Sequence, residues 1–148
     1  VHAHETHKAH AQKFAKTLHS WRSTYPSGTV VVTQGIGSDG HTAGIMPFPD
    51  DLERFTNLFE SPEWVVNYDT GNKNMYPLRT TVTNTFLREV VDQSIVYARG
   101  VSKKDYVKNI CSNTVKKNVA TFPAKILTEM KKVFVITDQE IEASDTEN

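Results

Sequence analysis

The hydrophobic residues of the chain change their spacing several times between its two ends. Over residues 5–23 they return every three or four positions, which predicts an amphipathic helix. Residues 29–33 form instead a short, mostly β-branched run, which predicts a buried strand. Strands that alternate with helices are typical of an α/β fold, so we expect one domain, residues 1–148, with α/β/α layers around a mostly parallel sheet. The same patterns predict further helices at 50–59, 103–116 and 123–131 and further strands at 64–68, 93–98 and 133–137.

One threonine-rich stretch leaves the strand pairing open. Residues 79–85 alternate between polar and apolar side chains, as a half-buried strand does. The next predicted strand, at 93–98, follows closely enough to pair with it as an antiparallel hairpin. We therefore expect a mixed sheet in preference to a purely parallel one.

Composition and charge exclude several classes of partner. The 17 Lys and Arg residues balance 17 Asp and Glu residues, so the chain has no net charge that would attract nucleic acid or an anionic membrane. No apolar run approaches the length of a membrane span. The single cysteine, Cys111, excludes an internal disulfide, and this usage is typical of the reducing cytoplasm. We interpret Cys111 as a packed side chain rather than a nucleophile.

A glycine-rich stretch directly after the first predicted strand carries the clearest chemical signal. Gly35, Gly37 and Gly40 allow a tight turn there, because glycine has no Cβ and tolerates positive φ. Asp39 and His41 lie inside this turn, at the carboxyl end of a strand, where open α/β sheets bind their ligands. A histidine transfers protons near neutral pH, and a neighbouring aspartate orients its ring. His41 is therefore the candidate base, with Asp39 as its partner.

The spacing Gly-x-Gly-x-x-Gly also matches the fingerprint of dinucleotide-binding proteins. Such a site needs a long helix directly after the glycines, because the pyrophosphate binds at the N-terminus of that helix. Pro47 and Pro49 interrupt any helix at this point. We therefore expect no nicotinamide or flavin, and no other cofactor.

Four histidines near the amino terminus, His2, His4, His7 and His10, raise the question of a metal site. His4 and His7 are one residue closer than the zinc-protease motif His-Glu-x-x-His requires. Neither a cysteine nor a pair of carboxylates lies nearby to complete a set of four ligands. We interpret these histidines as a solvated helix end and predict no metal site.

Residues 35–47 read Gly-Ile-Gly-Ser-Asp-Gly-His-Thr-Ala-Gly-Ile-Met-Pro. This stretch resembles the signature loop of the 6-phosphogluconolactonases, which commonly reads Gly-Met-Gly-x-Asp-Gly-His-Thr-Ala-Ser-Leu-Phe-Pro. The related glucosamine-6-phosphate deaminases and isomerases begin similarly but continue His-Ile-x-Phe-Asn-Glu. Thr42 and Pro47 favour the lactonases, whereas Gly44 and Met46 depart from their usual sequence.

Weaker similarities to the lactonases follow in the family's order along the chain. Residues 79–83 resemble an Arg-Ile-Thr-Leu-Thr strand, and residues 100–103 resemble a Gly-x-x-Lys segment that precedes a helix. Residues 122–124 resemble a Leu-Pro-Ala segment, and residues 133–138 resemble the closing strand. The chain thus resembles the carboxy-terminal part of a lactonase, without the amino-terminal phosphate loop and Asp-Glu-Arg segment of the family.

The resemblance implies hydrolysis of 6-phosphogluconolactone to 6-phosphogluconate, a step of the pentose phosphate pathway, without a metal. A water would attack the lactone carbonyl, His41 would take its proton, and backbone amides of the glycine-rich stretch would stabilise the oxyanion. The phosphate requires cations near the loop, and Arg79 and Lys103 occupy the matching positions. The residues that we expect to bind the substrate are Gly37, Gly40, Thr42, Arg79 and Lys103.

Two alternatives stay open at the level of sequence. One is isomerisation or deamination of an amino-sugar phosphate, although the Asn-Glu pair of those enzymes is absent after His41. The other is a domain without catalysis, which binds a phosphorylated sugar or a partner chain. A chain that lacks the family's first strands has an exposed sheet edge, which a second copy or a partner chain would cover.

Overall fold

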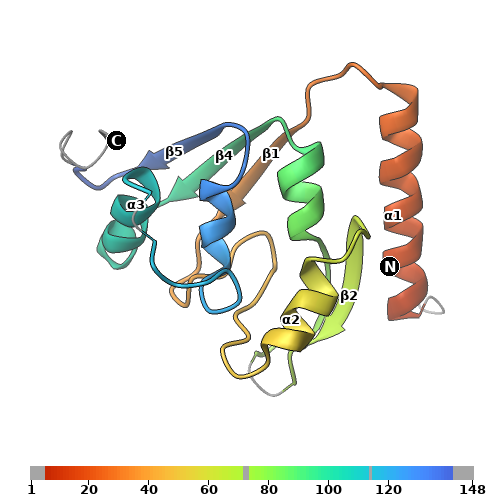
Figure 1. The fold of residues 1–148 in the computed structure, drawn as a ribbon, viewed down its shortest axis with the longest axis horizontal. Helices are drawn as coiled ribbons and strands as arrows, with labels where there is room; N and C mark the ends of the chain where they lie inside the picture. Colours follow the sequence, from red (N-terminus) through yellow and green to blue (C-terminus); the bar gives the residue numbers. More distant parts are fainter. Residues whose placement is uncertain (1–5, 72–73, 114, 142–148) are drawn as a thin grey trace.

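The computed structural model describes residues 6–71, 74–113 and 115–141 of the chain. The fold is α/β with a mainly parallel sheet, which confirms the predicted fold class (Figure 1). In chain order the elements are α1 (His7–Thr24), β1 (Val31–Gly35), α2 (Leu52–Phe59), β2 (Val65–Asp69), β3 (Leu78–Val82), the π-helix η2 (Phe86–Val90), β4 (Gln93–Ala98), the 3-10 helix η3 (Val101–Lys103), α3 (Lys104–Cys111), the 3-10 helix η4 (Pro123–Thr128) and β5 (Val133–Thr137).

The strands form two separate sheets. Strands β1, β4 and β5 are parallel and lie in the order β1-β4-β5. The prediction that residues 79–85 pair with 93–98 is wrong, because β3 pairs antiparallel with β2 in a second, two-stranded sheet. β4 is the central strand of the first sheet, so both of its edges are occupied and none is left for β3. The expected mixed sheet is therefore a purely parallel sheet beside an antiparallel hairpin.

Two helices begin where a side chain caps them. The Thr6 hydroxyl accepts a hydrogen bond from the backbone N–H of Ala9 at 3.2 Å, so α1 begins at the next residue, His7. The Asp51 carboxylate accepts one from the backbone N–H of Arg54 at 3.0 Å, directly before α2. Both helices start two residues later than the hydrophobic pattern predicts, because that pattern does not mark the cap.

Three other segments differ from their predictions. Helix α3 ends at Cys111 rather than at residue 116, because Asn113 turns the backbone into the left-handed region at φ 51°. The helix predicted at 123–131 is the shorter 3-10 helix η4. The strand predicted to reach residue 85 ends at Val82, because the Thr83 hydroxyl accepts a hydrogen bond from the backbone N–H of Phe86 at 3.1 Å and starts a helical turn.

The core lies between the short helices and one face of the parallel sheet. Val96 of β4 packs there with Leu87 of η2 and with Phe55 and Phe59 of α2, and all four are fully buried. Each such side chain contributes about 1.5–3 kcal/mol relative to an exposed position. In Figure 1, α3 lies beside the arrowhead ends of β4 and β5, whereas α2 lies below the sheet, next to β2.

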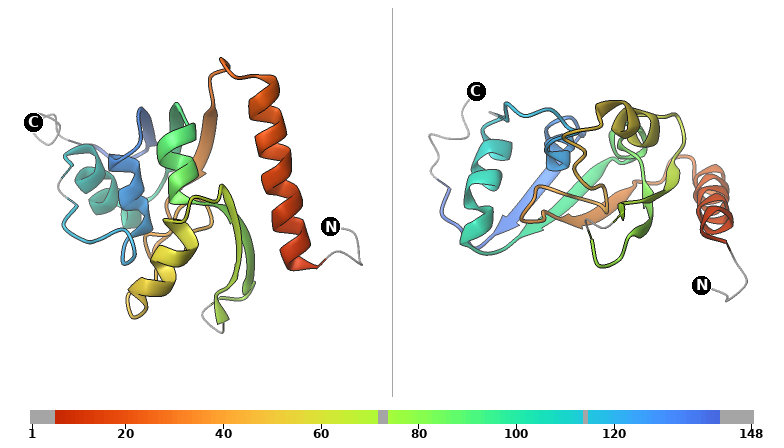
Figure 2. Two further views of the ribbon diagram at one scale, coloured as in Figure 1. Left: turned by 45° about the vertical axis from the view of Figure 1, so that its right-hand side comes forward. Right: turned by 90° about the horizontal axis from the view of Figure 1, so that it is seen from below.

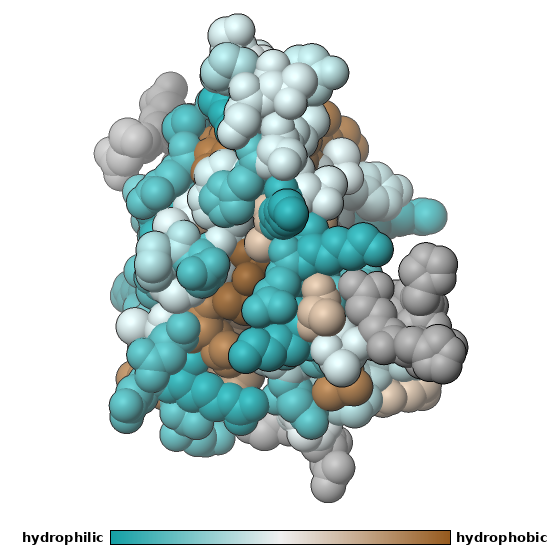
Figure 3. Space-filling model, turned by 90° about the vertical axis from the view of Figure 1, so that its right-hand side faces the viewer, coloured by the Kyte–Doolittle hydropathy of each residue, from teal (hydrophilic) through white to brown (hydrophobic). Residues whose placement is uncertain are grey.

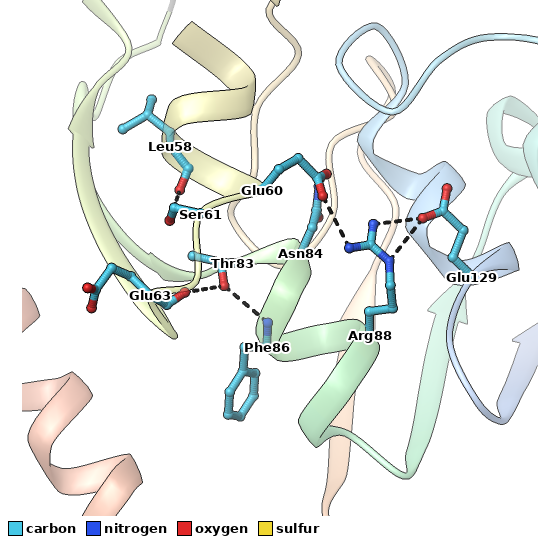
Figure 4. Close-up of polar contacts among 9 residues, drawn as sticks. All are labelled: Leu58, Glu60, Ser61, Glu63, Thr83, Asn84, Phe86, Arg88 and Glu129. Atoms are coloured by element: carbon cyan, nitrogen blue, oxygen red, sulfur yellow. Dashed lines mark hydrogen bonds and ion pairs between the residues drawn. The ribbon is translucent and has the colours of Figure 1, made fainter. Parts of the chain in front are cut away.

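An ion-pair network ties three of the short helices together. Arg88 of η2 donates to Glu60, directly after α2, at 3.1 Å and to Glu129, directly after η4, at 2.7 Å (Figure 4). The buried side-chain amide of Asn84 donates to the other oxygen of Glu60 at 2.7 Å. The network fixes the relative positions of α2, η2 and η4.

Within the described ranges, no helix combines the length and the apolar character that crossing a membrane demands.

Candidate functional site

The glycine loop, residues 35–44, begins at the carboxyl end of β1 and turns back sharply. The backbone N–H of Gly37 donates to the carbonyl of His41 at 2.8 Å, and that of Gly40 donates to the carbonyl of Gly37 at 3.1 Å. Gly40 has φ +84°, and a Cβ there would lie 2.3 Å from Cδ2 of Phe122, so only glycine fits. Both backbone amides therefore donate within the loop and stabilise its shape. The oxyanion of a lactone intermediate would need donors other than these two amides.

The ring of His41 lies against Gly37 and pairs with Asp39. A Cβ on Gly37 would lie 2.1 Å from Nδ1 of His41, so the position of the ring depends on this glycine. Nδ1 of His41 lies 2.5 Å from Oδ1 of Asp39, and the same oxygen accepts the backbone N–H of His41 at 3.2 Å. An ionised carboxylate only accepts hydrogen bonds, so Nδ1 carries the proton and Nε2 of the neutral ring has a free lone pair. The arrangement suits proton transfer at Nε2.

The charge state of Asp39 supports this assignment. Partial burial raises the pKa of Asp39, but hydrogen bonds from the backbone and the ring of His41 outweigh burial and hold the pKa below its ordinary value. Asp39 is therefore ionised at neutral pH. Both side chains are half-exposed, so solvent and small molecules reach the pair.

Thr42 lies on the inner side of the loop. Its side chain is fully buried, and its hydroxyl lies 2.8 Å from the carbonyl oxygen of Gly35 and 3.0 Å from Oε1 of Gln34. The amide of Gln34 donates in turn to the hydroxyl of Ser94 on β4 at 2.7 Å. This chain of hydrogen bonds anchors the loop to the sheet. Substrate binding by Thr42 stays a prediction, because a fully buried side chain touches a ligand only if the loop moves.

The β2–β3 hairpin holds the second half of the loop. The Tyr68 hydroxyl donates to the carbonyl of Gly44 at 2.6 Å, and the Thr81 hydroxyl donates to the carbonyl of Ala43. Arg79 pairs with Tyr68 across the hairpin and lies two residues from Thr81, so all three side chains share one face. Arg79 is half-buried, and its Nε donates to the carbonyl of Tyr76 at 3.0 Å. The predicted phosphate ligand thus lies on the hairpin face that contacts the loop.

Helix α3 and the 3-10 helix η4 hold the first half of the loop. The Tyr106 hydroxyl donates to the carbonyl of Ser38 at 3.0 Å, and the backbone N–H of Ala124 donates to the carbonyl of Gly40 at 2.9 Å. Lys103 lies one helical turn before Tyr106 and is half-buried, whereas its neighbour Lys104 is exposed. Arg79 therefore belongs to the hairpin that contacts the second half of the loop, whereas Lys103 ends η3, directly before the helix that contacts the first half.

The two side chains of the Asp39–His41 pair line different cavities. One, of about 350 Å³, is lined by His41 together with residues 33–37 and 43–44. The other, of about 300 Å³, is lined by Asp39, residues 46–49 and Arg54 among others. Neither Arg79 nor Lys103 lines the cavity of His41. The structure thus joins the predicted base to its carboxylate but does not place the predicted cations in the same cavity.

Arg54 is a candidate site residue that sequence reasoning missed. Its guanidinium lies 5.2 Å from the centre of the Phe48 ring and donates to the carbonyl of Asp69 at 2.7 Å. These contacts hold a cation at the wall of the cavity that Asp39 lines. A single arginine in the first turn of a short predicted helix gives no signal of such a role. The side chain reaches the cavity only because α2 packs beside the loop.

Among the amino-terminal histidines, His7 contacts the β2–β3 hairpin. His2 and His4 lie outside the described residues. Nε2 of His7 lies 2.7 Å from the carbonyl oxygen of Arg79, and its Nδ1 lies 3.5 Å from the side-chain nitrogen of Asn67. The ring therefore fastens α1 to the hairpin. In the described part of the chain, no group of three or more His, Cys, Asp or Glu side chains is placed to hold a metal ion.

The fold resembles those of solved proteins. The structure resembles a 6-phosphogluconolactonase from Shewanella baltica OS155, with a TM-score of 0.65, 21% identity, and coverage of 89% of this chain and 52% of that chain. It also resembles 6-phosphogluconolactonases from Plasmodium vivax, with a TM-score of 0.63, 20% identity and coverage of 86% and 50%, and from Trypanosoma brucei, with a TM-score of 0.61, 20% identity and coverage of 93% and 54%. No curated protein matches the sequence.

This chain spans about half the length of each of these solved structures. At such low identity, the structural likeness alone establishes a shared fold. The sequence model of the family described as glucosamine-6-phosphate isomerases/6-phosphogluconolactonase matches residues 1–136, which is most of the chain. The chain therefore belongs to the glucosamine-6-phosphate isomerase and 6-phosphogluconolactonase family.

Proposed function

We propose that the chain hydrolyses 6-phosphogluconolactone, with His41 as the general base and Asp39 as the residue that orients it. The observation that carries the proposal is the 2.5 Å contact between Nδ1 of His41 and Oδ1 of Asp39, inside the loop whose sequence resembles the lactonase signature. A base needs a free lone pair within reach of water, and Nε2 of this half-exposed ring provides one.

The reaction follows from this geometry in two steps. Nε2 of His41 takes a proton from a water molecule, and the water oxygen attacks the lactone carbonyl. The tetrahedral intermediate then collapses, the ring C–O bond breaks, and the imidazolium returns its proton to the leaving alkoxide. Asp39 stabilises the imidazolium between the two steps, because its carboxylate is ionised and in contact with the ring. Arg54, on the cavity that Asp39 lines, is a candidate to balance the developing negative charge.

Arg79 and Lys103 are the proposed phosphate ligands. Each is half-buried; Arg79 lies on a strand that bonds to the glycine loop, and Lys103 directly precedes α3, which also bonds to it. A phosphate carries negative charge at neutral pH and prefers arginine and lysine side chains. Since neither cation lines the cavity of His41, this proposal requires a substrate whose phosphate extends out of that cavity, away from its lactone.

A second candidate function is binding of a phosphorylated sugar without turnover by this chain alone. Two observations favour it: neither proposed cation lines the cavity of His41, and the chain spans half the length of the solved lactonases. In that case catalysis would require another polypeptide to complete the site.

Loss of the lactone above its spontaneous hydrolysis tests both candidates, with 6-phosphogluconate detected by a coupled dehydrogenase. We expect activity in the wild type, none above background in His41→Ala, and full activity in His19→Ala, whose ring stacks on Trp64 away from the loop. Equal background rates for wild type and His41→Ala contradict catalysis, and calorimetry with 6-phosphogluconate then tests binding. Turnover of glucosamine 6-phosphate instead of the lactone would favour an isomerase or deaminase.

A further inference from the structure

A cavity of about 360 Å³ lies between helix α3 and the segment at residues 115–122. This α3 cavity shares no lining residue with the cavities of Asp39 and His41. Figure 2 shows from two directions that α3 lies at the end of the molecule opposite to α1. The proposed hydrolysis of a lactone therefore gives the α3 cavity no role.

Two aromatic side chains and Val115 form the apolar part of the α3 cavity. The rings of Tyr106 and Phe122 lie with their centres 5.0 Å apart and their planes inclined by 43°. Phe122 is almost wholly buried, whereas Tyr106 is half-buried, so part of the Tyr106 side chain is accessible from the cavity. A wall of this kind favours a flat aromatic group, which gains free energy by stacking on the rings.

Two lysines line the same cavity. Lys116 and Lys117 are exposed, and neither forms an ion pair with a residue that the structure describes. Residues 103–117 contain five lysines and one acidic residue, Asp105, although the chain as a whole has no net charge. Lysine binds phosphate as a point charge, so this local excess of positive charge favours an anionic ligand.

The cavity between α1 and the β2–β3 hairpin lacks both features. It measures about 440 Å³, and its charged lining residues are one cation, Lys8, and one anion, Glu63. None of its described lining residues is aromatic. Figure 3, which faces α1, shows apolar surface between hydrophilic side chains on this side of the molecule. This α1 cavity therefore provides an internal control for the α3 cavity.

We propose that the α3 cavity binds a nucleoside monophosphate. The base stacks against Tyr106 and Phe122, the phosphate pairs with Lys116 and Lys117, and the Asp105 carboxylate accepts a hydrogen bond from a ribose hydroxyl. A nucleotide combines the flat ring, the anion and the hydroxyl that these side chains select. Small-molecule sites measure roughly 300–1,000 Å³, so a cavity at the lower end of that range suits one nucleotide better than a dinucleotide.

The rings of the α3 cavity also contact the glycine loop. The Tyr106 hydroxyl donates to the carbonyl of Ser38 at 3.0 Å. A Cβ on Gly40 would lie 2.3 Å from Cδ2 of Phe122, so this ring lies directly against the loop. Ser38 and Gly40 flank Asp39, the partner of His41. Occupancy of the α3 cavity is therefore coupled to the Asp39–His41 pair through two direct contacts.

Calorimetric titration of the whole chain with adenosine monophosphate tests the site. We expect one molecule to bind per chain, with a dissociation constant raised at least tenfold by Tyr106→Ala and by Lys117→Glu. Tyr106→Phe keeps the ring and should bind as tightly as the wild type. Lys8→Glu is the matched control, because it makes the same change of charge at the α1 cavity. The proposal is overturned by absence of binding at millimolar nucleotide, and equally by Lys8→Glu and Lys117→Glu weakening the binding alike.

Titrations with adenosine and with inorganic phosphate separate the two halves of the ligand. We expect each to bind more weakly than adenosine monophosphate, because each engages only the rings or only the lysines. Inorganic phosphate that binds as tightly as the nucleotide would contradict a site for the base. Circular dichroism of each variant verifies the fold, and Lys117→Glu tests the site even where Tyr106→Ala folds poorly, since Lys117 is exposed.

NMR of the histidine rings tests the coupling. Saturation with adenosine monophosphate should shift the ring signals of His41 and leave those of His7, which lies on α1, unchanged. Tyr106→Phe removes the donor to Ser38, so the His41 shift should shrink while the nucleotide stays bound. A His41 shift that Lys117→Glu leaves at full size would show nucleotide bound elsewhere and contradict the proposal. Neither experiment depends on lactone hydrolysis, so failure here leaves the proposed function untouched.

Discussion

Tyr68 lies directly opposite Arg79 across the β2–β3 hairpin, and its hydroxyl reaches out of that pair to the carbonyl of Gly44 at 2.6 Å. The same hydroxyl accepts the backbone N–H of Met46 at 3.2 Å. One side chain therefore connects the strand that carries a proposed phosphate ligand with the loop that carries the proposed base. Burial raises the pKa of Tyr68 to about 12, so the hydroxyl keeps its proton throughout the working pH range.

Tyr68→Phe should lower the free energy of unfolding by about 1–3 kcal/mol, because it leaves the carbonyl of Gly44 and the N–H of Met46 without their partner. Urea unfolding followed by circular dichroism measures the change. Tyr76→Phe is the control, since Tyr76 is exposed and should stay within about 0.5 kcal/mol of the wild type. Equal effects of the two substitutions would show that the loop does not depend on the hairpin.

Asp39→Asn should change both stability and its pH dependence. The pKa of Asp39 is lowered in the folded state from an ordinary value of 3.8, so its ionised form stabilises the fold. That contribution is present above pH 3.8 and is lost as the pH falls through the lowered folded value. We therefore expect wild type and Asp39→Asn to differ in unfolding free energy at pH 5 to 7 and to converge in acid. A difference that persists at the lowest pH contradicts an ionised Asp39.

The sequence predicts the local features of this fold better than its long-range ones. The strands 93–98 and 133–137 match β4 and β5, because each is a short apolar run with a clear end on both sides. The partner of β3 could not be predicted in the same way, since strand pairing depends on which edges the rest of the fold leaves open. The same limit applies to Thr42. The loop motif places this residue near the candidate site, but its side chain is buried and its hydroxyl bonds to the carbonyl of Gly35 at the end of β1.

In the candidate site, too, contacts between residues close in the sequence are predictable and contacts between distant residues are not. Asp39 and His41 are two residues apart, so the turn alone brings their side chains together and the motif predicts the pair. Arg54 reaches the site through the packing of α2, and no spacing in the sequence encodes that approach. The glycine-rich motif thus predicts the contact between Asp39 and His41, whereas the surrounding charges depend on tertiary structure.

Gly37→Ala should abolish lactone hydrolysis while leaving the protein folded. The added Cβ would lie 2.1 Å from Nδ1 of His41 and 2.7 Å from Oδ1 of Asp39, so the ring must leave the carboxylate. Loss of an oriented base typically costs a hundredfold or more in kcat. Gly28→Ala is the control, because a Cβ on Gly28 makes only ordinary contacts, at 3.4 Å and beyond. A Gly37→Ala variant that turns over at the wild-type rate would remove the His41–Asp39 pair from the mechanism.

Lys103 and Lys104 form a matched pair that separates phosphate binding from general charge. Lys103 ends η3 and Lys104 begins α3. Lys103 is half-buried and one turn from Tyr106, which bonds to the loop, whereas Lys104 is exposed. Lys103→Ala should raise the KM for 6-phosphogluconolactone about tenfold or more, the effect of losing about 1.4 kcal/mol of a charge-assisted contact. Its kcat should change little, because the phosphate lies away from the reacting carbonyl. Lys104→Ala should leave both constants near the wild type, since an exposed charge is screened by salt. Steady-state kinetics of the two variants decides the assignment, and equal KM values for Lys103→Ala and Lys104→Ala would take Lys103 out of the phosphate site.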